Sequence, residues 1–165
     1  MGKIKNVLFL CSGNTSRSPA AEYIAKWLKE TNYKDELKEV IFDSAGLYSY
    51  YKTPQEGTAN YLKSKNINFG DFEGKQINAE LIKKQDLILG FEEKWHVRKL
   101  KRRFKNLKEL DNKTFLLLDF TGKKDNLEIP DPINFEPDEY KRTLERIEDG
   151  VKKAVLKIIE INKKS

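Results

Sequence analysis

Apolar and polar positions along the chain predict an alternation of strands and helices. Four short apolar runs are each typical of a buried strand and cover residues 4–10, 39–43, 86–89 and 114–118. Apolar residues at i, i+3, i+4 and i+7, or start signals such as Pro54 and Asn78, predict helices over residues 18–31, 54–65, 79–84 and 92–104. This order predicts an α/β fold, in which a single three-layer domain over residues 1–165 has a four-stranded, mostly parallel sheet with helices on both faces.

Three further segments complete this arrangement. Ser44 to Gly46 is expected to form a turn at the carboxyl end of the second strand, the edge at which open α/β sheets bind their ligands. A polar loop is predicted over residues 119–127. Pro137 then begins the last helix, whose apolar stripe predicts packing against the sheet and consists of Tyr140, Leu144, Ile147, Val151, Val155 and Ile158.

Composition narrows the class of protein. A chain of 165 residues corresponds to one domain, and no apolar run is long enough for a transmembrane helix. The first residues predict a strand and not a signal peptide, so we expect a cytoplasmic protein without membrane attachment. The net charge of +6 favours anionic substrates. The basic residues within 94–105 are interpreted as a solvated helix face, which argues against nucleic acid as a partner.

The chain has one cysteine and one histidine. A single cysteine excludes an internal disulfide and any metal site built from several cysteines, and it is a candidate nucleophile. His96 is the one possible partner for a Cys–His pair, but it lies in a basic amphipathic stretch and is predicted at the surface. An activated cysteine would then depend on backbone dipoles and on an arginine.

That arginine follows the cysteine within one loop. Cys11 and Arg17 enclose five residues between the first predicted strand and a helix that begins at Ser18-Pro19. A loop of this kind directs N–H groups and the positive helix end at one point, which predicts an anion site. The same field favours the thiolate of Cys11, and the Arg17 guanidinium matches phosphate oxygens in pairs. The loop therefore predicts phosphoryl transfer through a cysteinyl-phosphate.

The segment Cys11-x5-Arg17-Ser18-Pro19 resembles the low-molecular-weight protein tyrosine phosphatases, with Gly13 and Asn14 also in register. The resemblance covers nearly the whole chain and implies hydrolysis of phosphomonoesters through a phosphocysteine, without metal or cofactor. It implies that Ser18 donates a hydrogen bond to the Cys11 thiolate. Asn14 would brace the loop, with Ser44 as its partner. The expected phosphate-binding and supporting residues are Ser12, Gly13, Asn14, Thr15, Ser16, Ser18 and Ser44.

A phosphate monoester also needs an acid, because an alkoxide or phenoxide leaves poorly unless it is protonated. Asp131, between Pro130 and Pro132, is the candidate general acid. Asp-Pro is common in turns, so the residues alone leave a plain turn as the alternative. The resemblance assigns the acid to this position, because the family carries it in an Asp-Pro loop before the C-terminal helix. It also favours Tyr50 and Ile133 as walls for the organic part of the substrate.

The sequence departs from the family pattern at four positions, one of which is Phe72, where a histidine is frequent. Many members carry a second cysteine where this chain has Ser16, and an aromatic residue where it has Ile133. Thr15 matches members that act on phosphoarginine. The expected substrate is therefore a phosphotyrosine protein or a small aryl phosphate, with inorganic phosphate as the product. The alternatives are a protein arginine phosphatase with the same mechanism and a non-catalytic phosphate-binding module. Arsenate reduction would need further cysteines.

Overall fold

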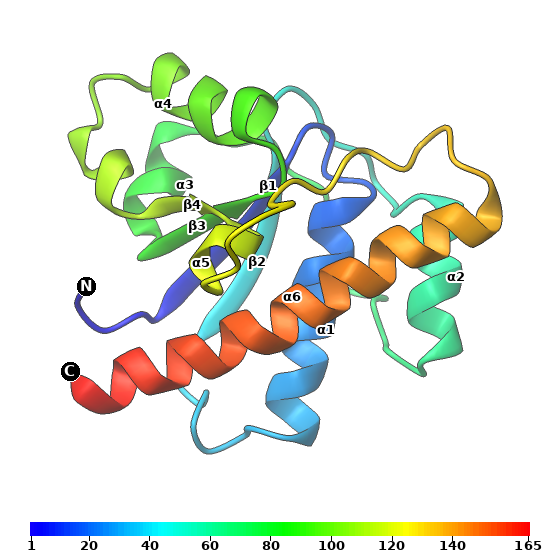
Figure 1. The fold of residues 1–165 in the computed structure, drawn as a ribbon, viewed down its shortest axis with the longest axis horizontal. Helices are drawn as coiled ribbons and strands as arrows, with labels where there is room; N and C mark the ends of the chain where they lie inside the picture. Colours follow the sequence, from blue (N-terminus) through cyan, green and yellow to red (C-terminus); the bar gives the residue numbers. More distant parts are fainter.

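A computed structural model describes residues 1–165 and contains one four-stranded sheet in the order β2-β1-β3-β4 (Figure 1). The strands are β1 (Asn6–Cys11), β2 (Ile41–Gly46), β3 (Leu87–Gly90) and β4 (Thr114–Leu116). All three pairings are parallel, so the predicted sheet is confirmed and is parallel throughout. Because the strands are parallel, their carboxyl ends meet at one edge, where β1 ends at Cys11.

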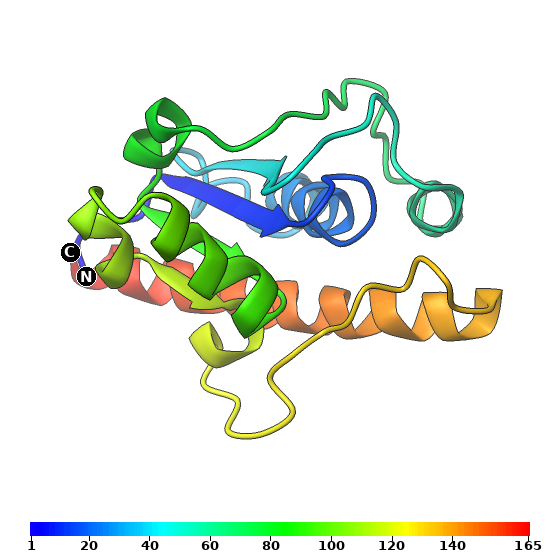
Figure 2. The same cartoon turned by 90° about the horizontal axis from the view of Figure 1, so that it is seen from above.

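Helices cover both faces of this sheet, which gives three layers (Figure 2). Val7 and Phe9 of β1 belong to a core cluster with helices α1 and α6. Leu8 and Leu10 belong to a smaller cluster with α3 and α4, since successive side chains of a strand point to opposite faces. The helical elements are α1 (Arg17–Thr31), α2 (Glu56–Ser64), α3 (Ala79–Lys84), η1 (Glu93–Arg98), α4 (Lys99–Arg103), η2 (Lys108–Asn112), α5 (Leu117–Phe120) and α6 (Pro137–Lys164).

Helix α6 runs the length of the molecule and passes over α1 (Figure 1). Every residue of its predicted apolar stripe is buried. Gly150 allows the helix to approach α5 closely, because a Cβ atom there would lie 2.9 Å from Leu118 and 3.0 Å from Leu117. Near its end, Asn162 donates to the Ile4 carbonyl and accepts from the Ile4 N–H, which brings the two termini together (Figure 2). None of the helices combines the length and the apolar character that crossing a lipid bilayer requires.

Two predicted boundaries were wrong. Ser44 to Gly46 does not form a turn but continues β2, in which Gly46 pairs with Cys11. This position needs glycine, because any side chain there would collide with the Ser49 carbonyl. The fourth strand ends at Leu116, and the predicted strand end and loop start form the short helix α5. Burial against α6 explains α5, because three of its four residues are apolar and buried.

Candidate active site

The loop between β1 and α1 presents its N–H groups to one side. Two carbonyls at the start of this segment accept hydrogen bonds from the chain that follows β2. Cys11 O accepts from Leu47 N at 2.8 Å, and Ser12 O accepts from Tyr48 N at 3.0 Å. The backbone N–H groups of residues 12–16 donate to no acceptor within the protein. These free donors and the N-terminus of α1 form a cradle for an anion.

Asn14 fixes the shape of this loop. Its φ of 50° lies in the left-handed region, which asparagine tolerates better than most residues. The side chain is fully buried, and its amide nitrogen donates to Ser18 Oγ at 3.0 Å and to Ser44 Oγ at 2.9 Å. Its oxygen accepts from the Lys75 N–H at 2.9 Å. Both ends of the amide are therefore satisfied, and the expected contact between Asn14 and Ser44 is present.

A chain of hydrogen bonds ends at the cysteine. Ser44 Oγ donates to Glu22 Oε1 at 2.5 Å and accepts from Asn14, while Ser18 Oγ accepts from Asn14 and lies 2.9 Å from Cys11 Sγ. Because the Asn14 amide occupies an acceptor site of Ser18, the Ser18 hydroxyl proton is free to face the sulfur. The contact expected between Ser18 and Cys11 is thus present, with the geometry that stabilises a thiolate.

The far end of this chain is a buried carboxylate. Burial raises the pKa of Glu22, while hydrogen bonds from Lys26 and Ser44 act in the opposite direction. Lys26 Nζ lies 2.6 Å from Glu22 Oε2, one helical turn away on α1. The lysine therefore compensates the charge of Glu22 and leaves its other oxygen for Ser44.

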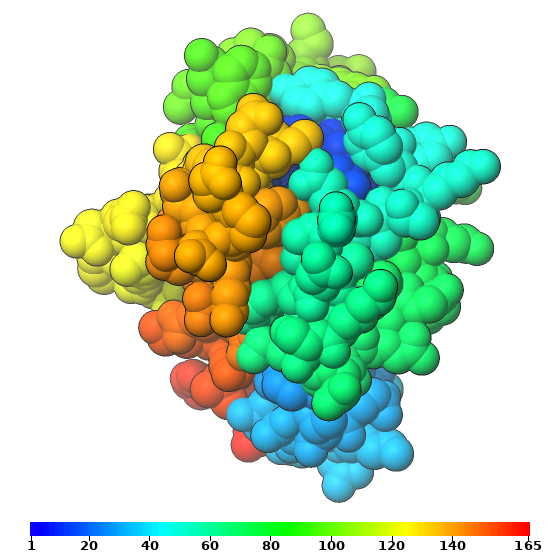
Figure 3. Space-filling view, turned by 90° about the vertical axis from the view of Figure 1, so that its right-hand side faces the viewer, coloured from blue at the N-terminus to red at the C-terminus, as the bar shows by residue number.

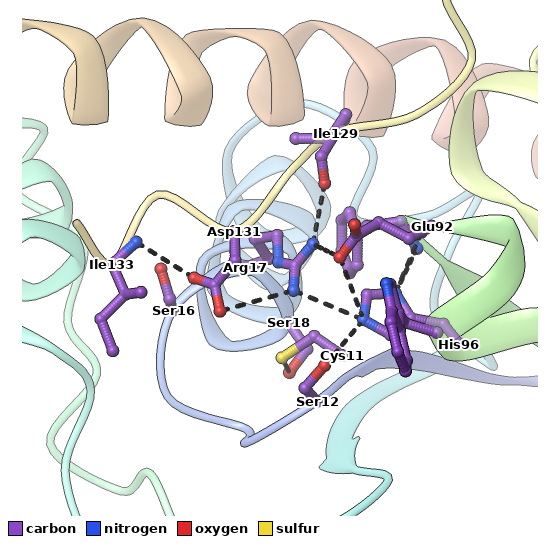
Figure 4. Close-up of polar contacts among 12 residues, drawn as sticks. Cys11, Ser12, Ser16, Arg17, Ser18, Glu92, His96, Ile129, Asp131 and Ile133 are labelled. Atoms are coloured by element: carbon purple, nitrogen blue, oxygen red, sulfur yellow. Dashed lines mark hydrogen bonds and ion pairs between the residues drawn. The ribbon is translucent and has the colours of Figure 1, made fainter. Parts of the chain in front are cut away.

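Arg17 is buried beside the loop, with 1% of its surface exposed. One nitrogen, Nη1, donates to Glu92 Oε2 at 2.6 Å and to the Ile129 carbonyl at 2.8 Å. The other, Nη2, lies 3.8 Å from Asp131 Oδ2 (Figure 4). The guanidinium is thus held through Nη1, which leaves Nη2 directed toward the cavity at Cys11.

His96 is fully buried, so its predicted surface position was wrong. Its Nδ1 accepts from the N–H groups of Phe91 and Glu92 at 3.0 Å each, which caps the π-helical turn η1. Burial and the Arg17 cation lower the pKa of His96 to about 3. The ring is therefore neutral, and because Nδ1 accepts, the hydrogen lies on Nε2, 3.2 Å from Ser12 Oγ (Figure 4).

Cys11, Arg17 and Asp131 line one cavity of about 410 Å³. Asp131 comes from the loop before α6, and its Oδ1 accepts from the Ile133 N–H at 3.1 Å (Figure 4). Its side chain is 45% exposed, so the carboxyl group is accessible from the cavity. The cavity thus joins the sulfur and the guanidinium of one loop with a carboxyl group from a distant part of the chain.

The walls of this cavity partly differ from the expected ones. Ile133 lines it as expected, but Tyr50 does not, and Tyr48 and Tyr51 do. Ser49 and Tyr51 also face the cavity, so Tyr50, which lies between them, projects elsewhere and is 55% exposed.

Ser16 replaces the second cysteine of many family members, and it has a polar partner here. Its Oγ lies 2.6 Å from the Oη of Tyr140 on α6. The same Oη lies 2.9 Å from Thr58 Oγ1 and donates to Gln55 Oε1 at 3.0 Å. Burial raises the pKa of Tyr140, so its hydroxyl stays protonated at neutral pH. The loop is therefore tied to both α2 and α6.

The comparisons with known proteins agree with this geometry. The family described as low molecular weight phosphotyrosine protein phosphatase matches residues 6–165. The phosphatase YfkJ of Bacillus subtilis is 30% identical, over 79% of this chain and 84% of YfkJ. Its crystal structure has a TM-score of 0.83 and covers 96% of this chain and 97% of that one. The YwlE arginine phosphatase from Geobacillus stearothermophilus has a TM-score of 0.78 at 25% identity and covers 93% of this chain and 92% of its own.

The chain therefore belongs to the low molecular weight phosphotyrosine protein phosphatase family of cysteine-dependent hydrolases. A phosphoprotein substrate and phosphate as product follow from this membership.

The sequence did not reveal the roles of Glu92, His96, Tyr140 and Tyr51 in building the site. Glu92 carried a signal that was not used, because it follows β3 at the carboxyl edge of the sheet, where ligands bind.

Proposed function

We propose that this protein hydrolyses phosphotyrosine in proteins and small aryl phosphates through a phosphocysteine formed on Cys11. The observation that carries the proposal is the loop around that sulfur, where the free N–H groups of residues 12–16 share a cavity with Arg17 and Asp131. We expect the substrates to be cytoplasmic phosphoproteins.

The first step transfers the phosphoryl group to the enzyme. The Cys11 thiolate, held by Ser18, attacks phosphorus, so that an S–P bond forms as the bond to the leaving oxygen breaks. The loop N–H groups and Arg17 Nη2 stabilise the charge on the equatorial oxygens. Asp131 gives its proton to the leaving oxygen, and the adjacent phosphate dianion favours the protonated acid before that transfer.

The second step regenerates the enzyme. The Asp131 carboxylate accepts a proton from a water molecule as that water attacks phosphorus. The S–P bond breaks, inorganic phosphate leaves, and the Cys11 thiolate is restored. The same carboxyl group therefore acts as an acid and then as a base, which requires the partial exposure that Asp131 has.

His96 and Glu92 act as positioning residues. Glu92 holds Arg17 through Nη1, so that Nη2, which lies 3.8 Å from Asp131 Oδ2 and 3.4 Å from His96 Nε2, is the guanidinium nitrogen that meets the phosphoryl group. His96 Nε2–H donates to Ser12 Oγ, so the Ser12 hydroxyl proton is free to point into the cavity that Ser12 lines. Neutral His96 adds no second positive charge beside Arg17.

The cavity walls favour an aryl phosphate over phosphoarginine. Tyr48, Tyr51 and Ile133 offer apolar and aromatic surface to a phenol ring, and Asp131 is the one acidic group among the lining residues. A guanidinium leaving group would draw on that same carboxylate for both recognition and protonation. Protein arginine phosphatase activity is the second candidate, favoured by Thr15, which also lines the cavity.

The test measures phosphate release from p-nitrophenyl phosphate, a phosphotyrosine peptide and a phosphoarginine peptide at one pH. We expect turnover of the first two and a higher kcat/KM for phosphotyrosine than for phosphoarginine. Cys11→Ser should abolish turnover and still bind inorganic phosphate, because the N–H cradle is intact. A higher kcat/KM for phosphoarginine would select the second candidate, and phosphate binding without any turnover would favour the binding module.

A further inference from the structure

A second cavity, of about 660 Å³, lies between α2 and the first turn of α6. It is larger than the cavity at Cys11 and falls within the size range of ligand pockets. Figure 3 shows α2 in teal and the start of α6 in orange side by side, with the blue phosphate loop at the upper end of the space between them. We call it the α2–α6 groove, and its apolar and aromatic lining residues are Tyr61, Ile133, Phe135, Pro137 and Tyr140.

The groove continues from the proposed active site. Gln55 and Ile133 line both cavities, so a polypeptide whose phosphorylated side chain reaches Cys11 passes directly over these two residues. The rim formed by Tyr48 and Tyr51 belongs to the Cys11 cavity alone. The α2–α6 groove is therefore the direct extension of the catalytic cavity along the protein surface.

The floor of the groove is preformed. The Tyr140 ring packs on Gly57, where a Cβ atom would lie 2.7 Å from the ring, so that this contact needs glycine. The Tyr140 hydroxyl is fixed by Ser16, Thr58 and Gln55. Because these side chains are already held in place, a ligand that binds there does not have to immobilise them, which lowers the entropic cost of binding.

The rim of the groove carries acidic groups without partners. Glu56 and Asp138 are exposed, and neither forms an ion pair within the chain. Each lies in the first turn of its helix, which favours its negative charge and leaves its oxygens free for a ligand. These carboxylates contrast with the net charge of +6 of the chain, although Lys141 also lines the groove.

We propose that the α2–α6 groove binds the polypeptide of the phosphoprotein substrate beside the phosphorylated residue. An apolar side chain of the substrate packs on the floor, and a neighbouring lysine or arginine pairs with Glu56 and Asp138. This inference rests on the proposed function and adds the sequence context that the enzyme selects. It holds for either phosphorylated residue, because the groove begins outside the catalytic cavity.

The experiment compares kcat/KM for two peptides that share one phosphorylated residue and one leucine and differ in a single flanking residue, lysine or glutamate. The wild type should favour the lysine peptide. Glu56→Lys and Asp138→Lys should each lower that preference about two- to five-fold, the range of one exposed ion pair. The rate on p-nitrophenyl phosphate should stay unchanged, since this small substrate does not reach the groove.

Glu80→Lys is the matched control, because Glu80 is exposed and lies in the first turn of α3, a helix on the other face of the sheet. It should leave the peptide preference unchanged. Equal rates on both peptides, or an equal effect of Glu80→Lys, would overturn the proposal while p-nitrophenyl phosphate is still hydrolysed. A dimer that Asp138→Lys dissociates would overturn it in favour of a second copy of the chain. Loss of turnover of every substrate would instead contradict the proposed function.

Discussion

The Nε2 atom of His96 lies 3.2 Å from the Oγ atom of Ser12, although 84 residues separate them in the sequence. The chain's one histidine thus lies under the phosphate loop, with Nδ1 bound to two backbone N–H groups. This arrangement makes it a neutral donor at fixed geometry and not a partner that titrates with Cys11.

The protonation of His96 can be observed directly, because the chain has no other histidine. Its pKa of about 3 predicts that the imidazole nitrogen NMR signals show the Nε2–H tautomer and do not shift between pH 8 and pH 5. A midpoint near 6.5, the ordinary value, would contradict the buried neutral ring.

The same pKa predicts a pH dependence of stability. The folded-state pKa lies below the unfolded value, so the stability from neutral His96 is complete above pH 6.5 and is lost as the pH falls toward 3. The loss is about 1.4 kcal/mol per pH unit in that window. Between pH 7 and pH 5, the free energy of unfolding measured with urea should fall by about 2 kcal/mol more in the wild type than in His96→Gln. Equal losses in both would mean that His96 does not titrate on unfolding as described.

A double-mutant cycle tests the contact between His96 and Ser12. Ser12→Ala and His96→Leu should each lower kcat/KM, and the double variant should lose less than the product of the two effects. We expect a coupling of about two- to ten-fold, the contribution of one hydrogen bond. The control pairs Ser12→Ala with Trp95→Phe, because Trp95 adjoins His96 in sequence and is 45% exposed. That pair should be additive, and an additive result for His96 would remove its positioning role.

Asn14 should be replaceable only at a cost in both stability and rate. Asn14→Gly keeps the backbone free to adopt a φ of 50° but removes three hydrogen bonds. Asn14→Ala removes the same bonds and adds about 1 kcal/mol of backbone strain. Unfolding should therefore rank wild type above glycine and glycine above alanine, and both variants should have a lower kcat as Ser18 loses its orientation. Equal stability of the two variants would mean that the loop relaxes out of this conformation.

The role of Asp131 depends on the leaving group. Asp131→Ala should lower kcat on a phosphotyrosine peptide by about 10²- to 10⁴-fold, the usual contribution of a general acid. The loss should be smaller with p-nitrophenyl phosphate, because its leaving group needs less protonation. Asp131→Asn serves as the matched variant, which keeps the side-chain shape without an acid proton. An unchanged kcat on the peptide would refute the assignment.

The sequence predicted the parts of the site that are local. The phosphate loop, the strand before it and the helix after it lie within one continuous segment, and Asn78 caps α3 as predicted. The partners of the loop could not be predicted, because Glu92, His96 and Tyr140 lie 75, 79 and 124 residues from the loop residues that they contact. The sequence favoured Tyr50, but the structure places Tyr51 at the cavity, and one residue of offset decides which ring lines it.

The central claim is that Cys11 carries the phosphoryl group during turnover. The most direct measurement is mass spectrometry of acid-quenched Asp131→Ala enzyme mixed with p-nitrophenyl phosphate, because loss of the base that activates water lets the intermediate accumulate. The account predicts one phosphoryl group, located on the peptide that contains Cys11. Continued phosphate release from an unmodified Cys11, or a phosphoryl group on another side chain, would contradict it.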